Sequence, residues 1–180
     1  MIPEIVTYIL AIGLIAIYIP RIRPSVIRRI RSRGLRNAHF LIIELVILAL
    51  AIMQLILLTP EATTLTYAGT VIFLAGVILT VVARFQLKQN YMPAFSANNP
   101  ERIIMTGPYG LVRHPIYLGM LLFIVGFELV LEPILSVLAL LSLIIFVIQI
   151  NQEEKMISEN LEGWKTFTEK TRYRLIPFVW

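Results

Sequence analysis

The sequence predicts an all-α, polytopic membrane protein with about five transmembrane helices. Apolar residues make up 58% of the 180 residues, charged residues make up only 15%, and the mean hydropathy is +0.81. Soluble domains usually contain about 45–50% apolar and about 25% charged residues, so the apolar surplus here indicates lipid as the solvent. The length fits a single membrane domain, 1–180, with three spans in 1–87 and the chemistry in 88–180.

The predicted spans are apolar runs whose lengths approach the roughly 20 residues that cross a bilayer. The fourth run is short, about 24 Å at a rise of 1.5 Å per residue. Glu132-Pro133 separates the fourth run from the fifth, which predicts a C-terminal helical hairpin. The five runs are Pro3–Ile19, His39–Leu58, Thr66–Leu87, Ile116–Leu131 and Ile134–Ile150.

The basic residues predict the orientation of the spans. When the arginine-rich loop 21–36 is placed in the cytoplasm and the spans alternate, all sixteen Lys and Arg residues fall on the cytoplasmic side. This distribution obeys the positive-inside rule and puts the N-terminus outside and the C-terminus inside. Ser25–Arg36 could instead form a short interfacial helix, but a basic loop that sets the topology is the favoured interpretation. A prokaryotic plasma membrane and an endoplasmic reticulum membrane both fit, and the first run is expected to be retained rather than cleaved.

Several function classes are excluded by composition. The chain has no cysteine, which excludes disulfides, thiolate catalysis and cysteine–metal sites. Its only histidines are His39 and His114, so no metal site is predicted. The net charge of +5 accompanies apolar spans, which favours anionic lipid over nucleic acid as the partner.

Two long polar segments, Lys88–His114 and Asn151–Trp180, are expected to meet on the cytoplasmic side and to hold the chemistry. The more informative stretch is 106–119, TGPYGLVRHPIYLG. Pro115 suits the first position of a helix, and the N–H groups of that helix end could bind an anion. Arg113, His114 and Tyr117 could equally be interface anchors, and on physical grounds alone the two interpretations have even weight.

A second stretch, Gln149–Ile157, carries paired Glu153 and Glu154 where the fifth span leaves the bilayer. The pair could neutralise a cationic ligand. Taken alone, an ordinary solvated helix end is the better interpretation, because Glu is a good helix former.

Four residues inside the spans also need an explanation. Glu44 and Glu128 are ionisable groups in apolar runs, where such groups are costly and usually functional. Glu44 could also snorkel to the cytoplasmic surface, and an interfacial location is favoured for Glu128. Gly69 and Gly76 share one face and predict close packing against another helix.

Together the two stretches resemble the isoprenylcysteine carboxyl methyltransferases and the related phospholipid N-methyltransferases. The resemblance covers roughly Glu101 to Phe178. It rests on Gly-Pro-Tyr-x-x-x-Arg-His-Pro-x-Tyr-x-Gly, a helical hairpin, Glu-Glu, and a basic-aromatic tail that ends in Ile-Pro-Phe. It implies an enzyme that uses S-adenosylmethionine as methyl donor.

The resemblance also implies site residues. Glu153 is matched to the cofactor-binding glutamate because it lies twenty-four positions before Pro177. Glu154 is a candidate base if the acceptor is an ammonium group. Gln149 stands where the eukaryotic isoprenylcysteine enzymes carry an arginine assigned to the substrate carboxylate, which puts a prenylcysteine substrate in doubt. The implied cofactor-binding residues are Glu101, Arg102, Ile103, Ile104, Tyr109, His114, Pro115, Ile116, Tyr117 and Glu153.

The predicted function is therefore a membrane S-adenosylmethionine-dependent methyltransferase. Its acceptor is expected to be lipophilic, a prenylcysteine-like carboxylate or a lipid amine, and to enter from the bilayer. Two alternatives stay open at this point. One is a membrane NADPH-dependent reductase of the sterol reductase type, which carries a similar Arg-His-Pro-x-Tyr segment, and the other is a non-catalytic membrane protein that binds lipid or a partner.

Overall fold

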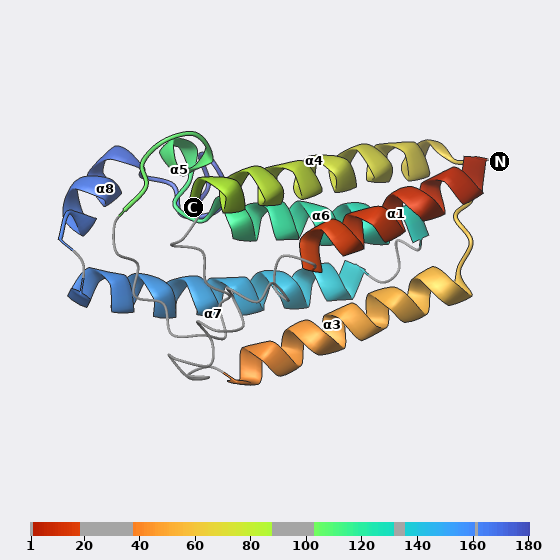
Figure 1. The fold of residues 1–180 in the computed structure, drawn as a ribbon, viewed down its shortest axis with the longest axis horizontal. Coiled ribbons are helices and arrows are strands. Elements are labelled where there is room, and N and C mark those ends of the chain that lie inside the picture. Colours follow the sequence, from red (N-terminus) through yellow and green to blue (C-terminus); the bar gives the residue numbers. More distant parts are fainter. Residues whose placement is uncertain (1, 19–37, 88–102, 132–135, 161) are drawn as a thin grey trace.

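The computed structural model describes residues 2–18, 38–87, 103–131, 136–160 and 162–180, and the regular secondary structure of these residues is helical, with one isolated bridge. The long helices run side by side along the molecule, and the short ones gather at the end opposite the N-terminus (Figure 1). The helices are α1 (Ile2–Tyr18), α3 (Ala38–Leu57), α4 (Thr64–Leu87), α5 (Pro108–Leu111), α6 (Pro115–Leu131), α7 (Ser136–Asn160) and α8 (Trp164–Lys170).

The five predicted apolar runs all form helices, and four of them end within two residues of the predicted limits. The fifth differs, because α7 continues to Asn160, about ten residues beyond the end of the apolar run at Ile150. The extra turns contain Gln, Glu and Lys, which favour helix, and they carry the paired glutamates. The Glu132-Pro133 turn and the Ser25–Arg36 segment lie outside the described residues.

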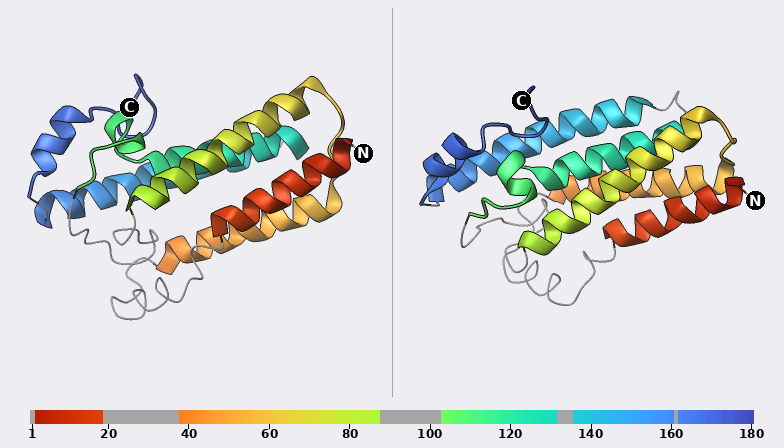
Figure 2. Two further views of the ribbon diagram at one scale, coloured as in Figure 1. Left: turned by 45° about the horizontal axis from the view of Figure 1, so that its top comes forward. Right: turned by 90° about the horizontal axis from the view of Figure 1, so that it is seen from above.

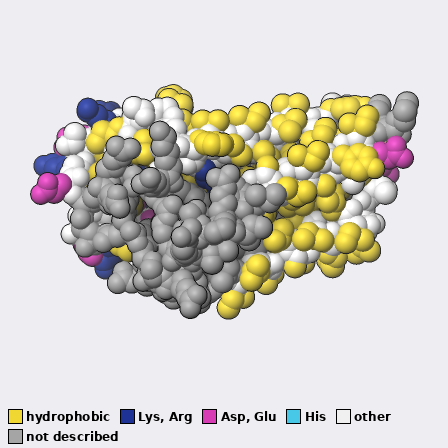
Figure 3. Space-filling view, in the orientation of Figure 1, with side chains coloured by type: hydrophobic (Ala, Val, Ile, Leu, Met, Phe, Trp, Pro, Cys, Tyr) yellow, Lys and Arg dark blue, Asp and Glu magenta, His cyan; other side chains and the backbone are white. Residues whose placement is uncertain are grey.

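One described helix, α4, is both long and apolar enough to cross a membrane on its own. Within the described residues α1, α6 and the Leu45–Leu57 part of α3 are apolar but shorter. The prediction of five spans therefore stays a prediction. Large apolar side chains are nevertheless exposed along α1, α3, α4 and α7, and hydrophobic side chains dominate the right-hand half of the visible surface (Figure 3). A contiguous apolar surface of this kind is typical of contact with lipid or a partner.

The closest helix pair is α4 and α6, which lie against each other in both views of Figure 2. Glycines let the two backbones touch: a Cβ on Gly76 would lie 2.3 Å from the Phe123 nitrogen, and one on Gly126 would lie 2.3 Å from the Phe73 nitrogen. The predicted close packing at Gly69 and Gly76 is thus confirmed, with α6 as the partner. This contact fixes the start of α6, where the motif residues lie.

A buried polar pair lies in the same bundle. The Glu128 side chain on α6 is buried and accepts a 3.5 Å hydrogen bond from Gln54 Nε2 on α3. This burial differs from the interfacial location that the sequence favoured for Glu128, because Gln54 supplies a polar partner inside the bundle. The side chain of Glu44 lies outside what the structure describes.

Candidate functional site

The start of α6 positions the first group of site residues. The α4–α6 contact holds this helix, and the His114 carbonyl accepts the first helical hydrogen bond, from Leu118 N, at 3.1 Å. Pro115 follows at the first helical position, where its missing N–H has no consequence. His114, Pro115 and Tyr117 are buried, and Ile116 is half-buried.

The C-terminal tail fixes the segment just before α6. The Arg113 nitrogen donates to the Tyr173 carbonyl at 2.9 Å, and the His114 nitrogen donates to the Arg174 carbonyl at 2.9 Å. Thr171 adds a 3.1 Å hydrogen bond from its hydroxyl to the Tyr109 carbonyl on α5. The described parts of the two polar segments that the sequence expected to meet therefore lie together, joined by backbone hydrogen bonds.

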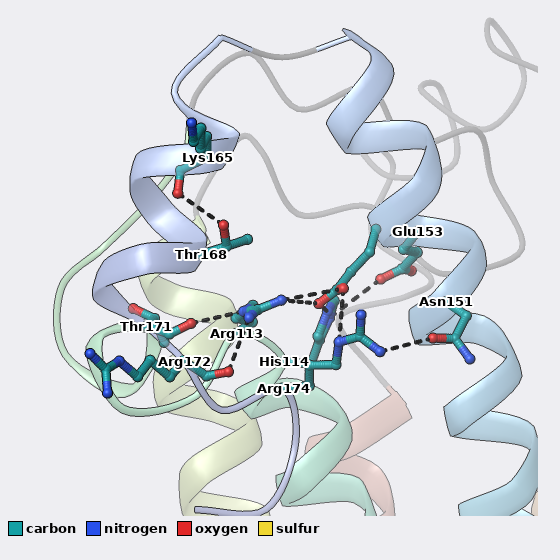
Figure 4. A network of polar contacts seen from close by, with 10 residues as sticks. Arg113, His114, Asn151, Glu153, Lys165, Thr168, Thr171, Arg172 and Arg174 are labelled. Carbon is teal, nitrogen blue, oxygen red and sulfur yellow. Dashed lines mark hydrogen bonds and ion pairs between the residues drawn. The ribbon is translucent and has the colours of Figure 1, made fainter. Parts of the chain in front are cut away.

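Glu153 and Glu154 face the start of α6 from α7, one turn beyond the apolar part of that helix. The Tyr117 hydroxyl donates to Glu153 Oε1 at 2.7 Å. His114 lies between the two carboxylates, with Nδ1 3.8 Å from Glu153 Oε2 and Nε2 3.2 Å from Glu154 Oε1. Figure 4 shows His114 and Glu153 at close range, with Arg113 and Arg174 beside them.

Glu154 is the centre of an ion-pair network. Its Oε1 lies 3.1 Å from Arg113 Nη1, and its Oε2 lies 3.0 Å from Arg174 Nε. Burial opposes the charged form, but the hydrogen bond to His114 and the charges of His114, Arg113 and Arg174 outweigh it, so the pKa of Glu154 is lowered. Glu154 is therefore an anionic anchor for the groups around it.

Arg113 and Arg174 are fixed by further contacts. Arg113 Nε donates to the Thr171 carbonyl at 2.8 Å, and Nη2 donates to the Arg172 carbonyl at 3.0 Å. Arg174 Nη1 donates to Asn151 Oδ1 at 3.3 Å, and its guanidinium lies 5.3 Å from the centre of the Trp180 ring. These hydrogen bonds use several N–H donors of one planar guanidinium group, which the single ammonium group of Lys could not replace.

Glu153 is the more accessible of the two carboxylates. Its side chain is 17% exposed, against 8% for that of Glu154. The Tyr117 ring that reaches it packs on Phe146 of α7, with ring centres 5.3 Å apart. A partly exposed carboxylate beside a hydroxyl donor and the His114 ring has the charge to attract a cation.

The other predicted residues lie at different distances from this cluster. Gln149 is buried one turn before Glu153 on α7 and lines a neighbouring cavity rather than the ion-pair network. Tyr109 is buried on α5, and its carbonyl is tied to Thr171. Ile103 and Ile104 are half-buried in the irregular segment before α5, whereas Glu101 and Arg102 lie outside the described residues.

The sequence did not identify the contacts of Glu154 with Arg113 and Arg174. Arg113 was considered as a possible interface anchor and as part of the Arg-His-Pro motif, and no role was assigned to Arg174. The available signal was the charge balance, since the sequence predicts the two glutamates, the basic motif and the basic tail on the same side of the membrane. Among the described residues no group of acidic residues and histidines could hold a metal ion.

The sequence of this chain matches one known protein family. A family model described as phospholipid methyltransferase matches residues 64–162, more than half of the chain. The match begins with α4 and ends just after α7, so it includes the α4–α6 contact and both halves of the cluster. No curated protein matches the chain.

Proposed function

The chain belongs to the phospholipid methyltransferase family, and on that premise we propose that it is a membrane methyltransferase that uses S-adenosylmethionine and a lipophilic acceptor. Family membership implies methyltransferase activity in general and association with membranes. The identity of the donor, the acceptor and the residues that bind them are parts of the proposal. The observation that carries it is the cluster of Tyr117, His114 and Glu153, which unites the two stretches that resemble methyltransferases.

The described residues fit S-adenosylmethionine in charge. The donor is a cation with a polar amino-acid end, and Glu153 offers a partly exposed carboxylate beside an apolar wall formed by Tyr117 and Phe146. When bound, S-adenosylmethionine supplies a methyl group whose bond to sulfur breaks, leaving the electron pair on sulfur, as a lone pair of the acceptor bonds to the carbon. Glu153 and Tyr117 are the residues that we assign to holding it, with His114 and Tyr109 nearby.

Glu154 is assigned a positioning role in place of the candidate role as a base. A general base works best when its pKa is near the working pH, whereas the lowered pKa of Glu154 makes it a poor proton acceptor. Its contacts with Arg113, Arg174 and His114 lock the tail against α6 and α7. His114 is thereby held facing Glu153. This arrangement suits a reaction that depends mainly on orientation and exclusion of water.

We further propose that α1, α3, α4, α6 and α7 all cross the bilayer, with the cluster at the cytoplasmic end. The exposed apolar side chains along the bundle support this arrangement, and so does the location of every Lys and Arg residue in segments assigned to one side. A soluble donor would then reach Glu153 from the cytoplasm. A lipophilic acceptor would arrive from the bilayer between helices.

Calorimetric titration with S-adenosylhomocysteine tests the proposal. Detergent-solubilised wild type is expected to bind saturably, and Glu153→Gln is expected to bind at least about tenfold more weakly, since a hydrogen bond to a charged group contributes about 1.5–3 kcal/mol. Glu159→Gln is the matched control, because Glu159 is an exposed glutamate on the same helix. Absence of binding by folded wild type would refute the methyltransferase proposal.

A further inference from the structure

A short loop after α8 presents apolar side chains to the outside of the protein. Phe178 is 86% exposed, the largest exposed fraction among the large apolar side chains that the structure describes, and Val179 is 76% exposed. Leu111 on α5 is 70% exposed and adjoins Val112, whose backbone forms a bridge with Tyr173. The Tyr173 ring packs on that of Phe178, with ring centres 5.1 Å apart. We call Leu111, Phe178 and Val179 the apolar tip.

Backbone hydrogen bonds hold this loop in a closed turn. The Trp180 backbone oxygen accepts from the nitrogens of Arg174 and Leu175, both at 2.9 Å, and the Trp180 nitrogen donates to the Ile176 carbonyl at 3.1 Å. Phe178 has a φ of 66°, a conformation that is usual for Gly, is tolerated by Asn and is rare for a bulky residue. A Phe that the turn holds outward at such a position is an outlier that points to a use for its side chain.

The loop lies at the level where the apolar helices end. Arg174 Nη1 donates to Asn151 Oδ1 at 3.3 Å, and Asn151 is the first residue after the apolar run of α7. The Arg174 carbonyl accepts from the nitrogen of His114, the residue just before α6, at 2.9 Å. In both figures that show the ribbon, the C-terminus lies close to the end of α4 and the start of α6 along the long axis of the molecule (Figures 1 and 2). In the proposed orientation this level is the cytoplasmic surface of the bilayer.

We propose that the apolar tip inserts into the boundary between headgroups and acyl chains in the cytoplasmic leaflet of the bilayer that the helices cross. Interfacial segments typically bury their apolar side chains about 5–10 Å into this boundary and keep Lys and Arg on the polar side. Just before the loop, Lys170 and Arg172 are exposed beside the exposed Glu169, so basic charge prevails there and favours anionic headgroups. The inference rests on the proposed crossing of the bilayer and is independent of methyl transfer.

Depth-dependent fluorescence quenching tests the location of the tip. The natural chain has no cysteine, so Val179→Cys can carry a single bimane label. The protein is placed, one copy per disc, in nanodiscs of phosphatidylcholine and phosphatidylglycerol that contain a phospholipid with a nitroxide either near the top or near the end of its acyl chain. Because the boundary is shallow, the label should be quenched about twofold more strongly by the upper nitroxide than by the lower one.

Two reference positions separate the possible results. Ile78, near the middle of α4, is 61% exposed, and a label on Ile78→Cys should be quenched more by the lower nitroxide. Lys165 is exposed in α8, and a label on Lys165→Cys should be quenched by neither. Quenching at Ile78→Cys without quenching at Val179→Cys would reject insertion of the tip and leave the spans standing. Absence of quenching at Ile78→Cys would reject the spanning arrangement, and the proposal with it.

A substitution in the tip tests whether Phe178 drives the insertion. Phe178→Asn removes the apolar ring but keeps a residue that tolerates positive φ, so the turn should be retained. It should at least halve the quenching of the Val179→Cys label by the upper nitroxide. Leu65→Asn, which alters an exposed leucine at the opposite end of α4, should leave that quenching unchanged, and equal melting temperatures in detergent show that both variants fold.

Two results would overturn the proposed insertion. One is unchanged quenching in Phe178→Asn. The other is a Val179→Cys label that no nitroxide lipid quenches and whose emission shifts to the blue only when detergent-solubilised protein is concentrated, which would assign the tip to contact between copies of this chain.

Discussion

The Tyr117 hydroxyl donates a 2.7 Å hydrogen bond to Glu153 Oε1 and so joins the first turn of α6 to the polar end of α7. The Tyr117 ring is also held by packing on Phe146 at 5.3 Å and by the His114 ring at 5.9 Å. The hydroxyl can therefore be removed with little change to the surrounding packing. This property makes the contact suitable for a double-mutant cycle.

Tyr117→Phe is expected to weaken S-adenosylhomocysteine binding about fivefold, because a hydroxyl that orients Glu153 is lost while the ring remains. The effect should largely disappear in the background of Glu153→Gln, since the two residues act through one contact. Calorimetry on the two single variants and the double variant measures the coupling. Additive losses would show that Tyr117 acts independently of Glu153.

Glu154→Gln is expected to lower the stability of the protein more than it lowers the affinity for the methyl donor. The substitution leaves Arg113, whose side chain is 13% exposed, without its ion pair to Glu154, and breaking a buried pair costs about 3–5 kcal/mol. Arg174 is 36% exposed and adds little, because solvent screens its charge. Thermal unfolding in detergent measures the loss. Glu162→Gln, at an exposed position, is the control and should melt as wild type does.

The lowered pKa of Glu154 predicts a direction for the pH dependence of stability. A carboxyl whose pKa in the folded protein lies below its usual value of 4.5 stabilises the fold above about pH 4.5 and loses that contribution as the pH falls toward the folded pKa. Wild type should therefore show a falling melting temperature below about pH 4.5. Glu154→Gln should flatten that part of the profile, and Glu169→Gln, which alters an exposed side chain, should not. Parallel profiles for wild type and Glu154→Gln would contradict the assignment.

The contact between α4 and α6 predicts that even one methyl group is destabilising at Gly76. A Cβ there would lie 2.3 Å from the Phe123 nitrogen and 2.6 Å from the Gly119 carbonyl, so the helices must separate. Overpacking of this kind typically costs about 1–3 kcal/mol. Gly76→Ala should lower the melting temperature, whereas Ala75→Leu on the exposed side of α4 should not. An unchanged melting temperature for Gly76→Ala would show that the helices separate without cost.

The sequence predicted the elements that have strong periodic or compositional signals. Apolar runs gave the long helices almost to the residue, and Gly69 with Gly76 indicated a close helix contact, because these properties are local. The sequence did not predict α5, α8 or the extension of α7 to Asn160. α5 and α8 contain only four and seven residues, and the extension of α7 is polar, so none of them gives a long apolar pattern in the sequence.

In the candidate site, too, some features could be predicted from the sequence and others could not. His114, Tyr117, Glu153 and Glu154 were predicted as a group, and the structure brings their side chains together. The pairing of Arg113 and His114 with the tail was not predicted, because a single backbone bridge between segments about sixty residues apart leaves no pattern in either segment. The partner of Glu128 was missed for the same reason, since Gln54 lies on another helix.

The proposed topology can be tested with single cysteines, because the natural chain has none. Thr63 and Lys165 are both exposed and lie at opposite ends of the proposed spans, Thr63 just before α4 and Lys165 in α8. With five spans and the C-terminus inside, a membrane-impermeant maleimide added to intact cells should label Thr63→Cys but not Lys165→Cys. Lysis should expose Lys165→Cys to the reagent. Labelling of both positions in intact cells would contradict the five-span arrangement, and with it the cytoplasmic location proposed for Glu153.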